Sequence, residues 1–254
     1  MKVRILGCGT STGVPRIGND WGACDPDEPR NRRSRASILV SAGDTQVLVD
    51  TTPDMRAQLL AVGIATVEAV IWTHEHADHV HGIDDLRQLF HNAAAPIPGF
   101  AGERTTQSLS QRFNYVFQGR GGYPPTASLS LLEGETSFGP LRLDSVEQPH
   151  GGITSTGLLF THNSKKIGYS TDFNVLTDEM TALFSGIDLW IVDALRGRPH
   201  PTHNHLDRTL DYIERLRPKR AVLTHMDNSM DYRSLQRQLP PHVEPAYDGL
   251  EIEL

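Results

Sequence analysis

The feature that most constrains the fold is the segment His-Glu-His-Ala-Asp-His at residues 74 to 79, which comes after an apolar run from Val67 to Trp72. Such a run predicts a buried strand, so the segment lies in the loop at its end. Its three histidines and one aspartate bring imidazole nitrogens and a carboxylate oxygen into one small volume, which suits one or two divalent cations such as zinc. The alternative is a surface loop whose histidines are only solvated, but such a loop would leave so many metal-binding groups without a function. We interpret the segment as a metal site.

The composition is that of a globular protein, because 254 residues with 38% hydrophobic content can form a substantial core. No linker rich in Pro, Gly or Ser divides the chain, so we expect one domain over residues 1–254. The net charge of −7 argues against binding to bulk nucleic acid or to a membrane surface. There are only two cysteines, no signal-like apolar stretch near Met1 and no run of about 18 apolar residues. These features predict a cytoplasmic protein without a membrane span.

Apolar segments along the chain predict two successions of strands with helices between them. The predicted strands cover residues 2–6, 37–41, 45–50, 67–72, 141–147, 157–161, 166–170, 188–193, 220–224 and 249–253. The predicted helices run from near Pro53 to Gly63 and over 81–91, 105–117, 175–185 and 206–216. This order predicts an α+β fold in which two mixed β-sheets pack face to face and helices cover their outer faces, a four-layer αββα sandwich. Residues 92–140 mix Pro, Gly and aromatic residues, which indicates a lid or substrate-binding insertion.

Two loops near the amino terminus carry motifs of their own. The glycine-rich turn at 7–15 lacks the Gly-Lys-Ser/Thr ending of a phosphate-binding P-loop, so it is interpreted as a tight loop with exposed amides. Four arginines then cluster before the second predicted strand. These arginines are Arg30, Arg32, Arg33 and Arg35. Such a cluster is typical either of a solvated loop or of a contact to a phosphate-bearing ligand.

Further metal ligands must converge from other strand ends, and three residues after later strands qualify: His150, Asp172 and His225. Each alone is a weak signal, because a histidine at a strand end is often only hydrogen-bonded and Asp172 could cap a helix. With His74, His76, Asp78 and His79 they give five imidazoles and two carboxylates, enough for two ions that share one carboxylate. Asp50, at another strand end, either caps a turn or orients a ligand histidine.

These motifs resemble the metallo-β-lactamase superfamily, whose H-x-H-x-D-H motif and later ligands match the seven residues in the same order. The resemblance implies one metal held by His74, His76 and His150, a second held by Asp78, His79 and His225, and Asp172 as the bridge. Within the superfamily, Leu6-Gly-Cys-Gly-Thr-Ser, Asp50 and Asn204-His205-Leu206-Asp207 look like the PhnP branch of phosphodiesterases, which act on cyclic ribose phosphates. The branch also suggests a homodimer.

One departure from that branch concerns a structural zinc. Some PhnP relatives hold it with a cysteine cluster after the first strand and a histidine three residues past the last ligand. Here the corresponding positions offer only Cys24 and Asn228, so we expect no third zinc.

The chemistry implied is hydrolysis without a serine or cysteine nucleophile. Two ions about 3.5 to 4 Å apart lower the pKa of a shared water toward roughly 7 and so supply hydroxide. Zn²⁺ and Mn²⁺ both suit the mixed nitrogen and oxygen ligands. The resemblance assigns the leaving group's proton to His205, with His203 as the competitor. The candidate catalytic residues are thus His205 and Asp78, the latter also a metal ligand, and the expected substrate is a small phosphodiester.

Three alternatives remain open at this point. Endonucleolytic processing of transfer RNA 3′ ends uses the same ligands, but residues 92–140 carry only Arg104, Arg112 and Arg120 as positive charges to grip RNA. Thioester or lactone hydrolysis is open to the same pair of ions, although relatives with that activity add a helical domain after the last ligand. A non-catalytic metal-binding scaffold is the third, but every ligand position is filled.

Overall fold

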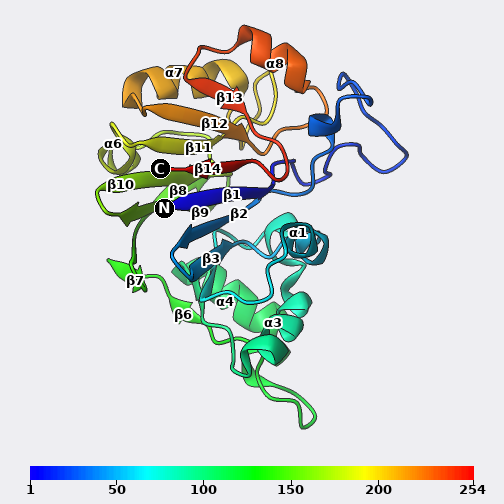
Figure 1. Cartoon of the computed structure of the whole chain (residues 1–254), viewed down its shortest axis with the longest axis vertical. Coiled ribbons are helices and arrows are strands. Elements are labelled where there is room, and N and C mark those ends of the chain that lie inside the picture. Colours follow the sequence, from blue (N-terminus) through cyan, green and yellow to red (C-terminus); the bar gives the residue numbers. More distant parts are fainter.

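The chain folds into two seven-stranded β-sheets, and the computed structural model describes all 254 residues. The first sheet contains both ends of the chain, because the strand at the carboxyl terminus pairs with the first strand (Figure 1). Across this sheet the strands follow the order β14 (Glu251–Glu253), β1 (Lys2–Gly7), β2 (Ser37–Ala42), β3 (Thr45–Val49), β4 (Ala69–Trp72), β5 (Gly99–Ala101) and β6 (Ser130–Leu131). Strands β3, β4, β5 and β6 run parallel to one another, so their carboxyl ends lie at the same edge.

The second sheet is formed by the later part of the chain. Its order is β13 (Val243–Pro245), β12 (Arg220–Thr224), β11 (Leu189–Asp193), β10 (Lys165–Ser170), β9 (Ile153–His162), β8 (Leu141–His150) and β7 (Thr136–Phe138). Here β10, β11, β12 and β13 are parallel, while β7, β8 and β9 are antiparallel to their neighbours. Both sheets are therefore mixed, as the sequence predicts.

Alternation along the strands explains how the layers pack. Leu39, Leu48 and Val70 are paired across β2, β3 and β4 and point away from the second sheet into an outer core with α1 and α3. Their neighbours along the strands, such as Val40 and Ile71, belong instead to the larger core between the sheets. Since consecutive side chains of a strand point to opposite faces, each strand serves both cores.

Helices cover the two outer faces of the sandwich (Figure 1). On the first sheet they are α1 (Met55–Val62), α2 (Ala77–Val80), α3 (Leu86–Ala93), α4 (Glu103–Arg112) and α5 (Asn114–Gln118). On the second sheet they are α6 (Asp178–Phe184), α7 (Leu206–Leu216) and α8 (Tyr232–Gln238). Two short 3-10 turns, η1 (Pro29–Asn31) and η2 (Ile83–Asp85), complete the list. This arrangement confirms the predicted four-layer α+β sandwich. None of the helices combines the length and the apolar character needed to cross a membrane.

All ten predicted strands are present, although several end one or two residues away from the predicted bounds and β8 and β9 are longer. The predicted helix over 81–91 is wrong in its first turn, because the α-helix begins only at Leu86. Gly82 breaks it: its amide donates to the Thr51 carbonyl, and a Cβ there would lie 1.9 Å from the Thr52 oxygen. The predicted helix over 105–117 is two helices, broken at Phe113.

Several elements carry too little sequence signal to be predicted. Strands β5, β6 and β7 have three residues or fewer each and lie in the 92–140 segment, where β5 and β6 extend the first sheet. Helix α8 was also missed, although its start has a recognisable cap, since the Asp231 carboxylate accepts from the Ser234 amide at 2.9 Å.

Candidate metal centre

Three site residues stand one or two residues after strands and adopt a left-handed backbone conformation. Asp50 follows β3 with φ 66°, Asp172 follows β10 with φ 52°, and His225 follows β12 with φ 59°. Non-glycine residues adopt positive φ uncommonly and at a cost, and such residues concentrate at functional sites. At each of these strand ends the turn redirects the side chain instead of continuing the alternation of the strand.

The structure brings all seven predicted side chains together into two groups of metal-binding atoms. Within each group the nitrogen and oxygen atoms lie within 4.8 Å of one another. The groups are His74, His76, His150 and Asp172 on one side, and Asp78, His79 and His225 on the other. The residues of the 74–79 loop come from the first sheet, and the other three come from the second, so the cluster lies where the edges of the two sheets meet.

Asp172 lies between the two groups and faces each with a different oxygen. Its Oδ2 is 3.7 Å from Nε2 of both His74 and His150. Its Oδ1 is 3.3 Å from Nε2 of His79 and 3.4 Å from Nε2 of His225. This is the arrangement expected of a carboxylate shared between two ions.

Three of the ring nitrogens that point into the cluster lack hydrogen-bond partners. Nε2 of His74, of His79 and of His225 is buried and unpaired, and distances of 3.3 to 3.7 Å to the carboxylate oxygens exceed those of good hydrogen bonds. Buried polar atoms normally find partners, so convergent orphan nitrogens call for a group that accepts lone pairs. The donor set fits divalent cations.

A second layer of contacts fixes the orientation of several of these imidazoles. Asp50 Oδ2 lies 2.7 Å from Nδ1 of His79, and Asp50 Oδ1 accepts the Thr73 amide at 2.8 Å. The Thr202 carbonyl lies 2.8 Å from Nδ1 of His150. Each contact leaves the Nε2 atom of the ring facing the cluster, which is the usual function of outer partners in metal sites. The contacts of Asp50 agree with its predicted orienting function.

The electrostatic environment keeps His74 and Asp172 in the protonation states that bind cations. Burial first, and then the neighbouring His79, lower the pKa of His74 well below its usual value, so its ring is neutral. Burial alone would raise the pKa of Asp172, but the imidazoles around it, His225 and His79 foremost, lower it well below its usual value. The carboxylate is therefore ionised.

The predicted proton donor His205 and its competitor His203 are placed differently. Nε2 of His203 lies 3.7 Å from Asp172 Oδ2, and its ring stacks on that of His225 with centroids 4.9 Å apart. His205 precedes α7 and makes no hydrogen bond, ion pair or ring contact with the seven side chains; its Nδ1 is buried without a partner. The structure thus places His203 beside the cluster, whereas His205 makes no hydrogen bond or ion pair with it.

Asp193, the last residue of β11, holds His203 in place. Its Oδ2 lies 3.1 Å from Nδ1 of His203, and the carboxylate is fully buried. Burial would lower the pKa of His203, but the charges of Asp193 and Asp172 outweigh it and raise the pKa to about 9. Sequence reasoning missed Asp193, although an aspartate at the end of an apolar strand is the same signal that singled out Asp50.

A further feature that the sequence does not reveal is the attachment of α4 to the metal-binding loop. Arg112 donates through Nη1 to the Glu75 carbonyl at 2.6 Å, and its Nη2 lies 2.7 Å from His81 Nε2. Arg104 Nε donates to Glu75 Oε1 at 2.6 Å. Because Glu75 stands between His74 and His76, two arginines of α4 support the loop that carries both histidines.

The four clustered arginines near the amino terminus all have partners within the chain. Arg30 pairs with Glu28, Arg32 lies over the Trp21 ring, and Arg35 pairs with Asp54. Arg33 is buried and donates to the carbonyls of Asp227 and Met230. Arg33 thus supports the loop that follows His225, and the expectation of a solvated loop is wrong for this residue.

Comparison with known proteins agrees with this geometry. The family model of the β-lactamase superfamily domain matches residues 45–226, which include all seven clustered side chains. The crystal structure of a diphosphatase from the PhnP family superposes with a TM-score of 0.91, is 34% identical, and covers 100% of this chain and 98% of that one. The structure of Zn²⁺-bound PqqB from Methylobacterium extorquens superposes with a TM-score of 0.81 over the full length of both chains; at 20% identity it shows a shared fold.

A relative found by sequence is the octanoyltransferase of Porphyromonas gingivalis, which is 31% identical over 99% of this chain. The chain spans only about half the length of that protein, 51%. The match of the family model, together with the PhnP-family structure, shows that the chain belongs to the metallo-β-lactamase superfamily of hydrolases and, within it, to the PhnP family.

Proposed function

We propose that this protein hydrolyses a phosphodiester or diphosphate bond in a small substrate, with two divalent metal ions held by the seven clustered side chains. The single observation that carries the proposal is Asp172, whose two oxygens face different groups of imidazoles at 3.3 to 3.7 Å. A buried carboxylate that faces ring nitrogens on both sides, three of them without hydrogen-bond partners, is suited to sharing between two cations.

In this proposal His74, His76 and His150 would hold one ion, Asp78, His79 and His225 would hold the other, and Asp172 would be shared between them. When bound, Zn²⁺ or Mn²⁺ would acidify water into a nucleophile at neutral pH and offset the negative charge of phosphoryl oxygens. Asp50 and the Thr202 carbonyl keep the imidazoles aligned by holding the ring nitrogens that face away from the cluster.

His203 is proposed as the proton donor in place of His205. Hydrolysis adds water to phosphorus and breaks the bond to the leaving oxygen, which then needs a proton. The Nε2 atom of His203 lies beside Asp172, while its Nδ1 is held by Asp193. This pairing fixes the ring and leaves Nε2 to donate to the leaving oxygen.

The choice of a phosphorus substrate is supported by the PhnP-family relative, which is itself a diphosphatase. Cyclic ribose phosphates and nucleotide-like phosphodiesters are the substrates first expected from the sequence, and a diphosphate joins them. Both bond types place an anionic phosphoryl group between an attacking water and a leaving oxygen, so the same groups would serve either.

The test is hydrolysis by protein that is stripped with a chelator and reloaded with Zn²⁺ or Mn²⁺. Three substrates separate the parts of the proposal: bis(p-nitrophenyl) phosphate, a 2′,3′-cyclic nucleotide and a dinucleoside diphosphate. The first has a leaving group that needs little protonation, whereas the cyclic nucleotide releases an alkoxide. His203→Ala should therefore reduce turnover of the cyclic nucleotide by a factor on the order of 10² to 10⁴, and that of the nitrophenyl ester much less.

His205→Ala is the matched control, because this histidine lies two positions away and makes no hydrogen bond or ion pair with the cluster. It should retain near-normal activity, and both variants should bind the same amount of metal. Failure of the loaded protein to hydrolyse any of the three substrates would refute the proposed function. Loss of activity in His205→Ala but not in His203→Ala would return the proton donor to His205.

A further inference from the structure

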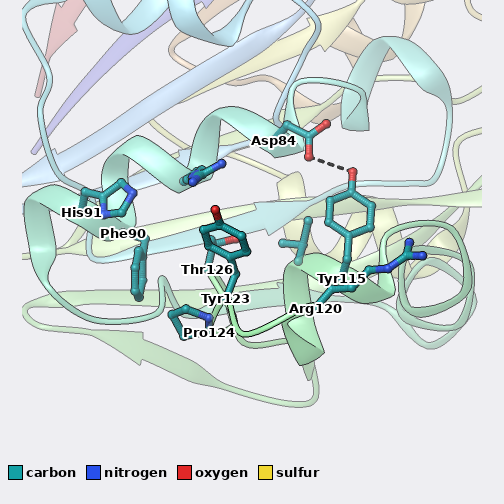
Figure 2. Close-up of a pocket in the computed structure, with 10 residues that line it drawn as sticks. Asp84, Phe90, His91, Tyr115, Arg120, Tyr123, Pro124 and Thr126 are labelled. Atoms are coloured by element: carbon teal, nitrogen blue, oxygen red, sulfur yellow. Dashed lines mark hydrogen bonds between the residues drawn. The ribbon is translucent and has the colours of Figure 1, made fainter.

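A separate cavity of about 470 Å³ lies on the first sheet's side, between α3 and the segment that follows α5. None of the residues around it belongs to the metal-binding cluster. Figure 2 shows Tyr123 near its centre, with Phe90 and Pro124 to one side and Tyr115 and Arg120 to the other. The cavity therefore has an apolar end and a polar end with an aromatic ring between them, and its volume falls in the range of small-molecule sites.

The lining of the cavity includes two arginines whose guanidinium groups are not paired with a carboxylate. The guanidinium groups of Arg87 and Arg120 form no ion pair and no side-chain hydrogen bond. The one carboxylate in the lining, Asp84, accepts the hydroxyl of Tyr115 at 2.7 Å (Figure 2). Burial and this carboxylate raise the pKa of Tyr115 to about 12, so the hydroxyl keeps its proton. In a chain of net charge −7, two unpaired arginines beside one cavity indicate an anionic ligand.

The aromatic part of the cavity is unusually accessible. Tyr123 is 68% exposed, although it is a large side chain with an apolar ring. The Arg87 guanidinium lies 5.1 Å from the centroid of this ring in a cation–π arrangement, and most of the tyrosine remains exposed. An exposed tyrosine ring next to free guanidinium groups is the combination that binds a base by stacking and a phosphate by charge.

We propose that this cavity binds a nucleoside monophosphate, with the base against Tyr123 and Phe90 and the phosphate at Arg120 and Arg87. The site is independent of the metal centre, so the proposal stands whether or not the proposed hydrolysis is found. A bare phosphate leaves the aromatic end unfilled, and an uncharged nucleoside leaves the guanidinium groups unpaired. Both parts of the ligand are therefore required.

Isothermal titration calorimetry of the metal-loaded protein with adenosine monophosphate, adenosine and ribose 5-phosphate tests the proposal. Adenosine monophosphate should bind more tightly than either fragment. Tyr123→Ala should weaken its binding about tenfold or more, while Tyr123→Phe keeps the ring and should bind like the wild type. The double variant Arg87→Ala/Arg120→Ala should lower the affinity for adenosine monophosphate to that for adenosine.

Arg215→Ala is the matched control, because Arg215 also lies over a tyrosine ring, that of Tyr212 at 5.9 Å, but on α7 outside the cavity. It should bind adenosine monophosphate normally. Unchanged affinity in Tyr123→Ala would place the nucleotide elsewhere, including at the metal centre, and would overturn the proposal. So would equal weakening in Tyr123→Phe and Tyr123→Ala, tight binding of ribose 5-phosphate, or no binding at all.

Discussion

Nδ1 of His203 lies 3.1 Å from Oδ2 of Asp193, a carboxylate that is fully buried at the end of β11. The same carboxylate oxygen is 3.4 Å from the amide of Asn204. Asp193 thus binds Nδ1 of His203, while the other ring nitrogen, Nε2, faces Asp172. The pair resembles other histidine–aspartate pairs in which the acid sets the tautomer and the orientation of the base.

Replacing Asp193 by Asn should therefore reduce catalysis without loss of metal. The amide can donate its NH₂ group to Nδ1, which then carries no proton, and this disfavours the doubly protonated ring of His203 that a proton donor needs. We expect kcat for a substrate with an alkoxide leaving group to fall by a factor on the order of 10², with a smaller fall for a nitrophenyl ester. Steady-state kinetics on both substrates, with metal content measured on the same samples, checks this. Equal reductions of kcat on the two substrates would contradict the proposal that Asp193 acts through proton donation by His203.

Asp50→Asn should weaken metal binding, because Asp50 Oδ2 is 2.7 Å from Nδ1 of His79. Loss of an outer carboxylate partner typically lowers metal affinity 10- to 100-fold, an order-of-magnitude expectation here. The affinity for Zn²⁺ can be measured by competition with a chromophoric chelator. Asp44→Asn, in the exposed turn between β2 and β3, is the control and should leave the affinity unchanged. Equal affinities in the two variants would deny Asp50 an orienting function.

Arg112→Ala should loosen the segment that carries His74 and His76. The change removes both the bond to the Glu75 carbonyl and the contact with His81. We expect metal affinity to fall about tenfold and one equivalent of metal to be lost first on dialysis against a chelator. Arg104→Ala should do less, because Arg104 contacts only the side chain of Glu75 and not the backbone of the loop. Arg142→Ala, an exposed arginine with acidic partners Glu135 and Asp144, is the control. Retention of both equivalents in Arg112→Ala would show that α4 does not support the loop.

The stability of the fold should depend on pH through Asp248. Its oxygens accept the Ser34 amide at 2.7 Å and the Cys8 amide at 3.1 Å. Burial raises the pKa of this carboxyl from 3.8 to about 6, and these hydrogen bonds offset only part of that shift. A raised pKa means that the folded protein binds the proton more tightly than the unfolded chain. The resulting stabilisation is complete below about pH 4 and is lost as the pH rises through about 6.

The comparison between wild type and Asp248→Asn isolates this effect. The wild type should gain on the order of 2 kcal/mol over the variant as the pH falls from 7 to 4, in line with about 1.4 kcal/mol per pKa unit. The free energy of unfolding is measured with urea. A chelator is present in both samples, so that neither protein holds metal. If the free energies of unfolding of the two proteins changed in parallel over this pH range, protonation of Asp248 would not be the source of the effect.

The sequence could predict the sandwich because each layer has a clear pattern. Leu39 and Leu48 alternate with Val40 and Val49, so the strands were visible as strands with two buried faces. It could also predict which residues cluster, since His150, Asp172 and His225 all stand at the ends of apolar runs. What determines these positions is the parallel arrangement of β10, β11 and β12, which brings strand ends to one edge.

The sequence could not distinguish His203 from His205, because two histidines that are two positions apart satisfy the same local pattern. Only the turn before α7 decides, and it directs His203 toward Asp193 while His205 precedes the helix. The arginines of α4 were equally hidden: Arg112 is 37 residues from Glu75, and no pattern connects them. Very short strands such as β6 depend on neighbours for their conformation, so their own residues carry little signal.

The division of the cluster between the two sheets has a mechanical consequence. His74 and His79 are anchored on one half of the sandwich, while His150 and His225 are anchored on the other. Ions held by residues of both sheets would restrain the two halves of the sandwich at the edge where they meet, in the way a cross-link restrains separate chain segments. Removal of the ions should increase the local motion of the two sheets at this edge. Hydrogen exchange should then become faster first at the ends of β4 and β12, and only later at the ends of the sheets far from the metal-binding cluster.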